Sequence, residues 1–364
     1  MKIKEIISAL DTLAPFSLQE EYDNAGLTTG HPEAEVHACL VCLDVTEDVI
    51  EEALKYQCDM IISHHPVIFK GIKRLTGRTM TERIVEKAIR GNIALCSIHT
   101  NLDNIEQGVN RKFCEKLGLH NTKILRKTGG VLRKLVTFCP VEYAERVREA
   151  IFKAGAGHIG EYEQCSFNAE GLGSFRAGDK ADPFVGKKGE LHFEKETRIE
   201  TIYPVYREAQ VVSALLEAHP YEEVAYDLYP LANDFSLAGA GMTGELVEEQ
   251  NETDFLARVK SVLNIPVIRH SALTGKTVKR VAVCGGAGSF LIQDAIRSEA
   301  EMFITADIKY HQFFDAEGRI VIVDAGHFET EQFTCEILAD YLKKKFTNFA
   351  VRISETLVNP VNYF

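Results

Sequence analysis

Apolar segments that suit buried strands alternate with amphipathic helical segments in two parts of this chain, and this alternation restricts the fold more than any other feature. Between 36 and 127 the segments are, in order, VHACLVCLDV, EDVIEEALKY, CDMIIS, TERIVEKAIR, NIALCSIHT and GVNRKFCEKLG. Apolar strands linked by helices are typical of a largely parallel sheet that is covered on both faces. From 277 to 364 the alternation returns and closes with the strand FAVRISE. The pattern predicts an α/β fold with a two-lobed core and a mostly parallel sheet.

The stretch from about 130 to 232 follows a different order. Its segments are VLRKLVTFCPV, EYAERVREAIFKAG, the glycine-rich GHIGEYEQCSFNAEGLGSFRAG, RIETIYPVY, REAQVVSALLEAH and EEVAYDLYPL. If the glycine-rich stretch supplies the missing strands, the order becomes β-α-β-β-α-β, which indicates a ferredoxin-like α+β unit. We therefore expect core lobe 1 at 1–127, an inserted domain at 128–234 and core lobe 2 at 235–364. The polar segment 178–190 is expected to be an exposed turn or hairpin tip.

Charge and cysteine usage limit the environment and the partners of the chain. The net charge is −12, and an acidic surface repels phosphate backbones, so nucleic-acid binding is disfavoured. No apolar run is long enough to cross a bilayer, and the N-terminus suits a surface helix rather than a signal peptide. Nine scattered cysteines favour reduced thiols and a cytoplasmic location. Cys39 and Cys42 lie three apart in one strand, so we expect two buried thiols on opposite faces.

Adjacent histidines stand at the end of the second predicted strand, in Ser63-His64-His65-Pro66. The carboxyl ends of strands are where open parallel sheets place their sites. Because the chain turns away at the proline, both imidazoles could reach one cavity. Taken alone, the pair fits exposed or core histidines equally well.

Two further groups follow strands in the same way. Asp103 comes after the strand NIALCSI, where it could supply an oxygen ligand or cap the next helix. His327 and Glu331 follow the strand RIVIVDAG and are four residues apart, so on a helix they share one face. Each group alone also fits an ordinary start of a helix.

Together the three groups offer three imidazoles and two carboxylates at strand ends of one α/β region. This number is too small for two closed structural zinc sites. It suits two divalent ions that share a carboxylate and a water and keep positions open for a substrate. Such ligands suit zinc, and also iron, manganese, nickel or cobalt.

With these residues in place, the sequence resembles the GTP cyclohydrolase 1 type 2 family (NGG-interacting-factor-three-like). The resemblance covers 1–127 and about 235–364. Five motifs carry it: Asp23-Asn24-Ala25-Gly26-Leu27, Ser63-His64-His65-Pro66, Thr100-Asn101-Leu102-Asp103, Thr305-Ala306-Asp307-Ile308-Lys309-Tyr310-His311 and Gly326-His327-Phe328-Glu329-Thr330-Glu331.

The resemblance implies a dinuclear site and an assembly. The two ions would be held by His64, His65, Asp103, His327 and Glu331, with Glu331 as the bridge. The inserted domain would be of the PII- or CutA-like kind carried by longer bacterial members, and the chains would form a ring-like homohexamer. A metal-activated hydroxide would open the purine of GTP and release formate, giving dihydroneopterin triphosphate.

Several expectations stay open at this level. His99 and His311 are candidates for proton shuttles or for contacts behind the ligands, since imidazole titrates near neutrality. The segment 284–289 follows a strand and could cradle phosphate, although a tight β-α turn explains it better. The same ligands would also suit a phosphoesterase or nucleotide phosphatase, and a non-catalytic regulatory scaffold that binds metal is the third alternative.

Overall fold

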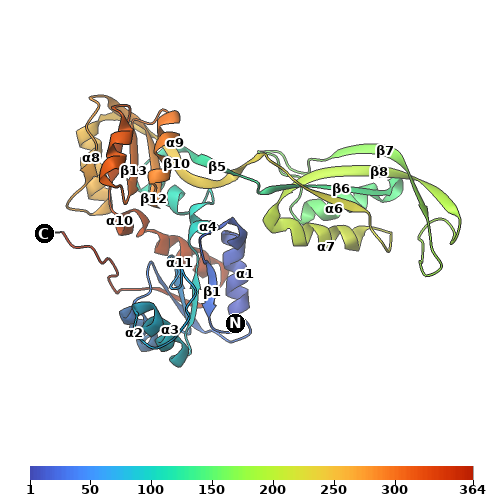
Figure 1. Cartoon of the computed structure of the whole chain (residues 1–364), viewed down its shortest axis with the longest axis horizontal. Coiled ribbons are helices and arrows are strands. Elements are labelled where there is room, and N and C mark those ends of the chain that lie inside the picture. Colours follow the sequence, from blue (N-terminus) through green and yellow to red (C-terminus); the bar gives the residue numbers. More distant parts are fainter. Residues whose placement is uncertain (364) are drawn as a thin grey trace. The chain divides into compact units, whose positions relative to one another are not determined.

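The computed structural model describes residues 1–363 and has a mixed α/β fold with several sheets (Figure 1). The chain forms two compact units, which are considered separately. The first combines Met1–Lys127 with Leu237–Phe364, and the second is Thr128–Ser236. Among the described residues, no helix is both long and apolar enough to cross a membrane.

The first sheet of the larger unit has five strands in the order β1-β4-β3-β2-β15. β4, β3, β2 and β15 run parallel, and β1 pairs antiparallel with β4 at one edge. Side chains of the central strands are buried on both faces, as apolar runs without alternation predict. The bounds are β1 (Gly26–Thr29), β2 (Ala38–Cys42), β3 (Met60–Ser63), β4 (Ala94–Ser97) and β15 (Ala350–Ile353).

The two faces of this sheet pack into different cores. One core gathers Ile6, Leu10 and Leu338 from α1 and α11, and it contains Cys39. The other gathers side chains of α2 and α3 and contains Cys42. Both thiols are buried, which confirms the prediction for this pair.

The second sheet has six strands in the order β11-β14-β13-β12-β10-β5. Its central strands β12, β13 and β14 are parallel, whereas β10 pairs antiparallel with β12 and β11 pairs antiparallel with β14. The sheet is therefore mixed rather than mostly parallel. The bounds are β5 (His120–Gly129), β10 (Asp234–Asn251), β11 (Arg269–His270), β12 (Thr277–Ala287), β13 (Met302–Ala306) and β14 (Val321–Asp324).

The smaller unit contains an antiparallel sheet in the order β7-β8-β6-β9. With its helices the order along the chain is β-α-β-β-α-β, and 178–190 lies in the connection between β7 and β8. Apolar side chains of α6 and α7 cover one face of the sheet, where they pack on Leu135, Ile199 and Tyr203. The bounds are β6 (Leu132–Pro140), α6 (Ala144–Lys153), β7 (Phe167–Arg176), β8 (Leu191–Pro204), α7 (Glu208–Ala218) and β9 (Tyr226–Pro230).

Most of the remaining helices of the larger unit lie close to the expected positions, whereas α4 and α8 were not predicted. The N-terminal segment forms α1, as its periodicity predicts. The bounds are α1 (Ile3–Leu13), α2 (Glu47–Lys55), α3 (Met80–Arg90), α4 (Thr100–Asp103), α5 (Val109–Lys116), α8 (Glu252–Leu263), α9 (Ile292–Arg297), α10 (His327–Glu331) and α11 (Thr334–Lys345). Short 3₁₀ turns are η1 (Phe16–Leu18), η4 (Ser289–Leu291) and η5 (Tyr310–Ala316) in this unit, and η2 (Val141–Tyr143) and η3 (Val205–Arg207) in the smaller unit.

Candidate metal centre

His64 and His65 lie directly after β3, where the chain leaves the sheet. The His64 and His65 amides donate to Cys42 O (3.1 Å) and Leu43 O (2.9 Å), so the backbone still follows β2. The Ser63 hydroxyl donates to the His65 carbonyl at 2.7 Å and fixes the turn before Pro66. Both imidazoles therefore reach the same side, although their positions on a regular strand would point them apart.

Asp103 is placed by the short helix α4, one turn after β4. The Asn101 side chain accepts a hydrogen bond from the His99 amide (2.9 Å) and donates to Ala14 O (2.7 Å). Because Asn101 is fully buried, it fixes the position of this turn against α1. The β3 and β4 ends are adjacent, since Ser63 pairs with Ser97, so Asp103 lies beside the two histidines.

His327 and Glu331 come from α10, which follows β14 of the second sheet. Gly326 has a φ of 90°, a backbone conformation that favours glycine and turns the chain into the helix. A Cβ added to Gly286 would lie 2.2 Å from Glu331 Oε1, and Gly286 also has a positive φ of 61°. Position 286 therefore requires glycine, because a side chain there would clash with the Glu331 carboxylate.

These five side chains form one cluster in which Glu331 occupies the centre. Its Oε2 lies 3.0 Å from His65 Nε2 and 3.1 Å from His327 Nε2, whereas its Oε1 lies 3.9 Å from His64 Nε2. His64 Nε2 is 3.7 Å from Asp103 Oδ1. Two groups of possible ligands result, one of His65, His327 and Glu331 and one of His64, Asp103 and Glu331. Glu331 belongs to both groups.

Two polar atoms of the cluster have no hydrogen-bond partner among the described residues. His64 Nε2 and Asp103 Oδ1 are both buried and unsatisfied. A buried polar atom without a partner costs about 1–3 kcal/mol. Here the two atoms are an imidazole nitrogen and a carboxylate oxygen that face one another. Together they are ligand atoms of the kind that binds a divalent cation.

The opposite nitrogen of each imidazole is held by an acceptor. His64 Nδ1 lies 2.9 Å from Ile98 O, His65 Nδ1 lies 2.8 Å from Asp44 Oδ1, and His327 Nδ1 lies 2.7 Å from Asp307 Oδ2. A proton on Nδ1 leaves the Nε2 lone pair free to face the cluster, as in most metal-ligating histidines. Sequence reasoning did not identify Asp44, although it follows the end of β2 as the ligands follow β3 and β4.

The surroundings shift the pKa values of these groups in opposite directions. Burial lowers the pKa of His64 to about 3. Burial would also lower the pKa values of His65 and His327, but hydrogen bonds to Glu331, Asp44 and Asp307 raise them to about 10 and about 9. Burial and the Glu331 charge raise the pKa of Asp103. Glu331 is buried, yet its hydrogen bonds to His327 and His65 hold its pKa well below the usual range. Without a metal, two protonated imidazoles thus compensate the Glu331 charge.

A dependence of stability on pH follows for the chain stripped of metal. His65 and His327 have folded-state pKa values of about 10 and about 9, above the ordinary 6.5. The folded chain therefore binds more protons than the unfolded chain in this range, and the free energy of unfolding must fall as the pH rises. We expect the contribution to be complete below pH 6.5 and lost as the pH passes through about 9 and 10. Urea unfolding in a chelator, repeated with His65→Gln, measures it, and equal slopes in both chains would contradict the assignment.

The two further histidines predicted from the sequence differ in position: His99 lies beside the cluster and His311 does not. His99 Nδ1 is held at 2.8 Å by Asp23, whose carboxylate also accepts from Thr100. The His99 ring lies 5.2 Å and 5.3 Å from the His64 and His65 rings, and the three could together bind an ion. His311 is exposed on η5 and packs against Tyr310, so it is not brought into the cluster.

The glycine-rich segment 284–289 does not offer free amides for phosphate. The amides of Gly285, Gly286 and Gly288 donate to the side chains of Asn110, Thr330 and Thr305 at 2.9, 3.0 and 2.9 Å. These bonds favour a structural turn, as expected, because the segment positions the backbone next to Glu331.

Comparison with known proteins places the chain among relatives over its full length. The family model Duf34/NIF3 (NGG1p interacting factor 3) matches 1–360. A Bacillus subtilis protein named GTP cyclohydrolase 1 type 2 homolog is 38% identical over 99% of this chain and 98% of its own length. A Bacillus cereus protein described as related to NIF3 has a solved structure with a TM-score of 0.86, 37% identity and coverage of 100% and 99% of the two chains. Staphylococcus aureus protein SA1388 gives a TM-score of 0.78 at 30% identity, with the same coverage.

Proposed function

The chain belongs to the Duf34/NIF3 family, and we propose that it is a metal-dependent hydrolase that acts on a nucleotide. The observation that carries the proposal is the position of Glu331 between two groups of ligands, with His64 Nε2 and Asp103 Oδ1 buried and unsatisfied beside it. A single structural ion would not need a carboxylate that faces both groups. His64, Asp103 and Glu331 would hold one ion, and His65, His327 and Glu331 the other.

The bound ions would lower the pKa of water and stabilise negative charge that develops on a reacting oxygen. The residues of the chain supply position and proton transfer. Asp44 and Asp307 orient His65 and His327 through hydrogen bonds to Nδ1. His99 is oriented by Asp23 in the same way, so its Nε2 is available to accept or deliver a proton at the substrate.

The loop that follows His65 and Pro66 favours an anionic substrate. It contains Lys70, Lys73, Arg74 and Arg78 and no acidic residue from 64 to 81, although the chain as a whole carries a charge of −12. All four cations are exposed, and none forms an ion pair with another residue in 1–363. Unpaired cations beside a reactive centre attract phosphate groups.

This loop is attached directly to the cluster. The Asn24 side chain donates through Nδ2 to the Ile68 carbonyl at 2.7 Å, and the Phe69 ring lies edge-on to His99 with 5.7 Å between centroids. Lys70 is the next residue. The beginning of the basic loop therefore lies at the histidines, where the phosphates of a bound nucleotide would be within reach of its cations.

Weakening the basic loop should raise KM and leave kcat nearly unchanged. In the Lys70→Ala/Lys73→Ala double variant, loss of one charge-assisted hydrogen bond to phosphate raises KM about tenfold or more. The effect should shrink at high salt, because exposed charges are screened. Steady-state kinetics at two salt concentrations measures it, with Lys153→Ala in the inserted unit as the matched control. A fall in kcat at constant KM would contradict phosphate binding by this loop.

We further propose GTP as the substrate, because the curated relatives carry the name GTP cyclohydrolase 1 type 2 homolog. Hydrolysis would open the five-membered ring of the base and release formate. Rearrangement of the ribose and closure of a new ring with loss of water would then give dihydroneopterin triphosphate. The test is to incubate the zinc-, iron- or manganese-loaded chain with GTP and to follow formate, phosphate and fluorescent pteridine together. Formate with pteridine supports the proposal, and phosphate alone would replace it with a phosphatase. Full metal occupancy without any product would favour the regulatory scaffold.

The division of the chain and its assembly also belong to this proposal. The order β-α-β-β-α-β of the smaller unit supports its assignment as a PII- or CutA-like domain inserted at 128–234 between core lobes at 1–127 and 235–364. A homohexamer in the cytoplasm follows from the family resemblance. Light scattering coupled to size-exclusion chromatography tests the hexamer directly, and a monomer at micromolar concentration would overturn it.

A further inference from the structure

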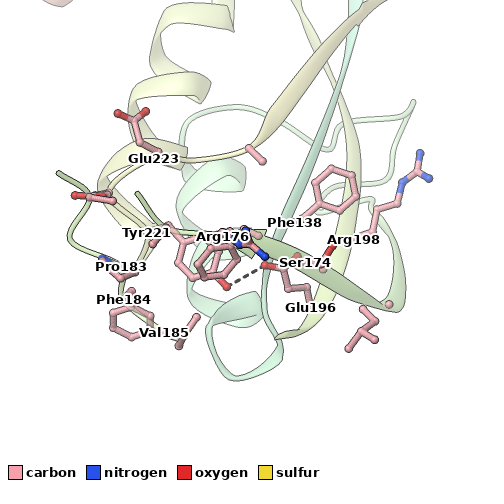
Figure 2. Close-up of a pocket in the computed structure, with 18 of the residues that line it drawn as sticks. Phe138, Ser174, Arg176, Pro183, Phe184, Val185, Glu196, Arg198, Tyr221 and Glu223 are labelled. Atoms are coloured by element: carbon pink, nitrogen blue, oxygen red, sulfur yellow. Dashed lines mark hydrogen bonds between the residues drawn. The ribbon is translucent and has the colours of Figure 1, made fainter. Parts of the chain in front are cut away.

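A cavity of about 640 Å³ lies within the smaller unit (Figure 2). Its volume falls in the range of small-molecule sites, roughly 300–1,000 Å³. Strands β7 and β8 contribute one part of the lining, Phe138 of β6 contributes one ring, and the segments 177–185 and 221–225 contribute the rest. None of the metal-cluster residues belongs to it.

The cavity exists because the middle of one face of β7 carries almost no side chains. Ala169, Gly171 and Gly173 are alternate residues of this strand, so they share a face. They pair with Arg198, Glu196 and Glu194 of β8, on the face opposite the helix-covered core that contains Ile199. Glycine weakens the interior of a strand and often marks a place where another group approaches closely. A Cβ added to Gly171 meets no atom within 4 Å, so it would project into open space.

Aromatic rings form the walls of the cavity. Tyr221 and Phe184 lie with 6.2 Å between ring centroids, and Phe175 lies 6.4 Å from Tyr221. Phe138 adds a fourth ring to the lining. A flat floor with aromatic walls suits a planar ring better than a flexible chain.

Two polar groups have unused capacity. The Tyr221 hydroxyl donates to Glu196 Oε1 at 2.9 Å, which fixes this carboxylate, and Oε2 has no partner among the described residues (dashed line in Figure 2). Arg176 forms no ion pair within 1–363, whereas Arg198 is paired with Glu200 at 2.9 Å and is directed away from the other lining residues in Figure 2. The cavity thus offers one fixed acceptor and one free guanidinium.

We propose that this cavity is a second small-molecule site, separate from the metal centre, that binds a planar heterocycle with two adjacent N–H donors and at most one anionic group. The edge of a guanine base has this pair of donors, and a guanine nucleoside or its monophosphate has the whole set. The ionised carboxylate of Glu196 only accepts hydrogen bonds, so it selects a donor edge over the mixed edge of adenine. Arg176 would bind the single anionic group.

The charge of the lining limits the number of phosphates. The lining contains four carboxylates, of Glu170, Glu196, Glu222 and Glu223, but only two guanidinium groups, of which that of Arg198 is already paired with Glu200. This excess of negative charge repels a triphosphate. The site therefore differs in preference from the basic loop at the metal centre, and it would report on guanine compounds that carry few phosphates.

Calorimetric titration of the full chain with guanosine, GMP, GTP and adenosine tests the proposal. The chain has no tryptophan, so calorimetry is preferable to intrinsic fluorescence. In the cavity we expect GMP to bind more tightly than guanosine, and both more tightly than GTP or adenosine. This order is read in Glu331→Gln, because GTP would also bind at the proposed metal centre of the unaltered chain. Parallel titration of Glu331→Gln separates the sites, because binding at the metal centre would be lost there and binding in the cavity would persist.

Three variants with a matched control locate the site. Gly171→Val places a branched side chain on the floor of the cavity, where its Cβ meets no atom within 4 Å, and should abolish guanosine and GMP binding, while thermal unfolding tests that the fold is kept. Glu196→Gln should weaken both ligands about tenfold or more, and Arg176→Gln should reduce GMP affinity to that of guanosine. The Arg198 charge is already paired with Glu200, so Arg198→Gln should change neither the affinity for guanosine nor that for GMP. Absence of guanosine and GMP binding, or binding that survives Gly171→Val, would overturn the proposal.

Discussion

Glu331→Gln is expected to lower turnover about a thousandfold or more and to deplete the chain of metal. The glutamine keeps the shape of the side chain, so the 3% exposed position remains filled. It loses the charge that faces His64, His65 and His327, and its amide would point a donor at an imidazole nitrogen. Ions held by carboxylate supply several kcal/mol of charge stabilisation, and each 1.36 kcal/mol is tenfold in rate.

The measurement pairs turnover with metal content by plasma mass spectrometry. Glu329→Gln is a matched control, because Glu329 is on the same helix and also buried, but its Oε1 accepts from Asn359 at 3.0 Å instead of facing the cluster. We expect the control to keep its metal and its activity. Two ions per chain in Glu331→Gln would show that Glu331 does not bridge them.

The gathering of His64, His65 and Asp103 could be predicted from the sequence for a simple reason. The strands that precede them are parallel neighbours, and parallel strands end at the same edge of a sheet. His327 and Glu331 follow a strand of the other sheet, and strand ends of separate sheets are not required to meet. Their place in the cluster was supported by the family resemblance, not by the periodicity.

The sequence alone could not predict the order of the strands or the acceptors that hydrogen-bond to the ligand histidines. The last strand, β15, is far from 1–127 in the chain, yet it pairs with β2 in the first sheet. Hydrophobic periodicity gives the type of a segment and not its neighbour. Asp44 likewise carries no spacing to His65 that marks a pair, because their contact crosses from β2 to β3. In contrast, turn residues, which act locally, indicated the 178–190 connection, and β7 was expected as one of the strands that complete the β-α-β-β-α-β order.

The second large effect is expected for His99→Gln, which should slow turnover about a hundredfold to ten-thousandfold while both metals stay bound. General acid–base catalysis by a positioned histidine contributes this range. His99 is held by Asp23 through Nδ1 and lies against His64 and His65, yet it has no contact with Glu331. Its removal would therefore eliminate a proton-transfer group without breaking the bridge.

A pH profile distinguishes this role from a purely structural one. If His99 transfers a proton, one limb of the kcat profile should disappear in His99→Gln, and Asp23→Asn should weaken the same limb because it frees the Nδ1 side. Metal content decides the alternative that the geometry also allows, since His64, His65 and His99 could together hold an ion. Loss of one ion per chain in His99→Gln would make His99 a ligand, and the proton would then have to pass through another group. Retention of both ions with an unchanged pH profile would exclude both roles, because a histidine that neither binds metal nor transfers a proton has no part in the reaction.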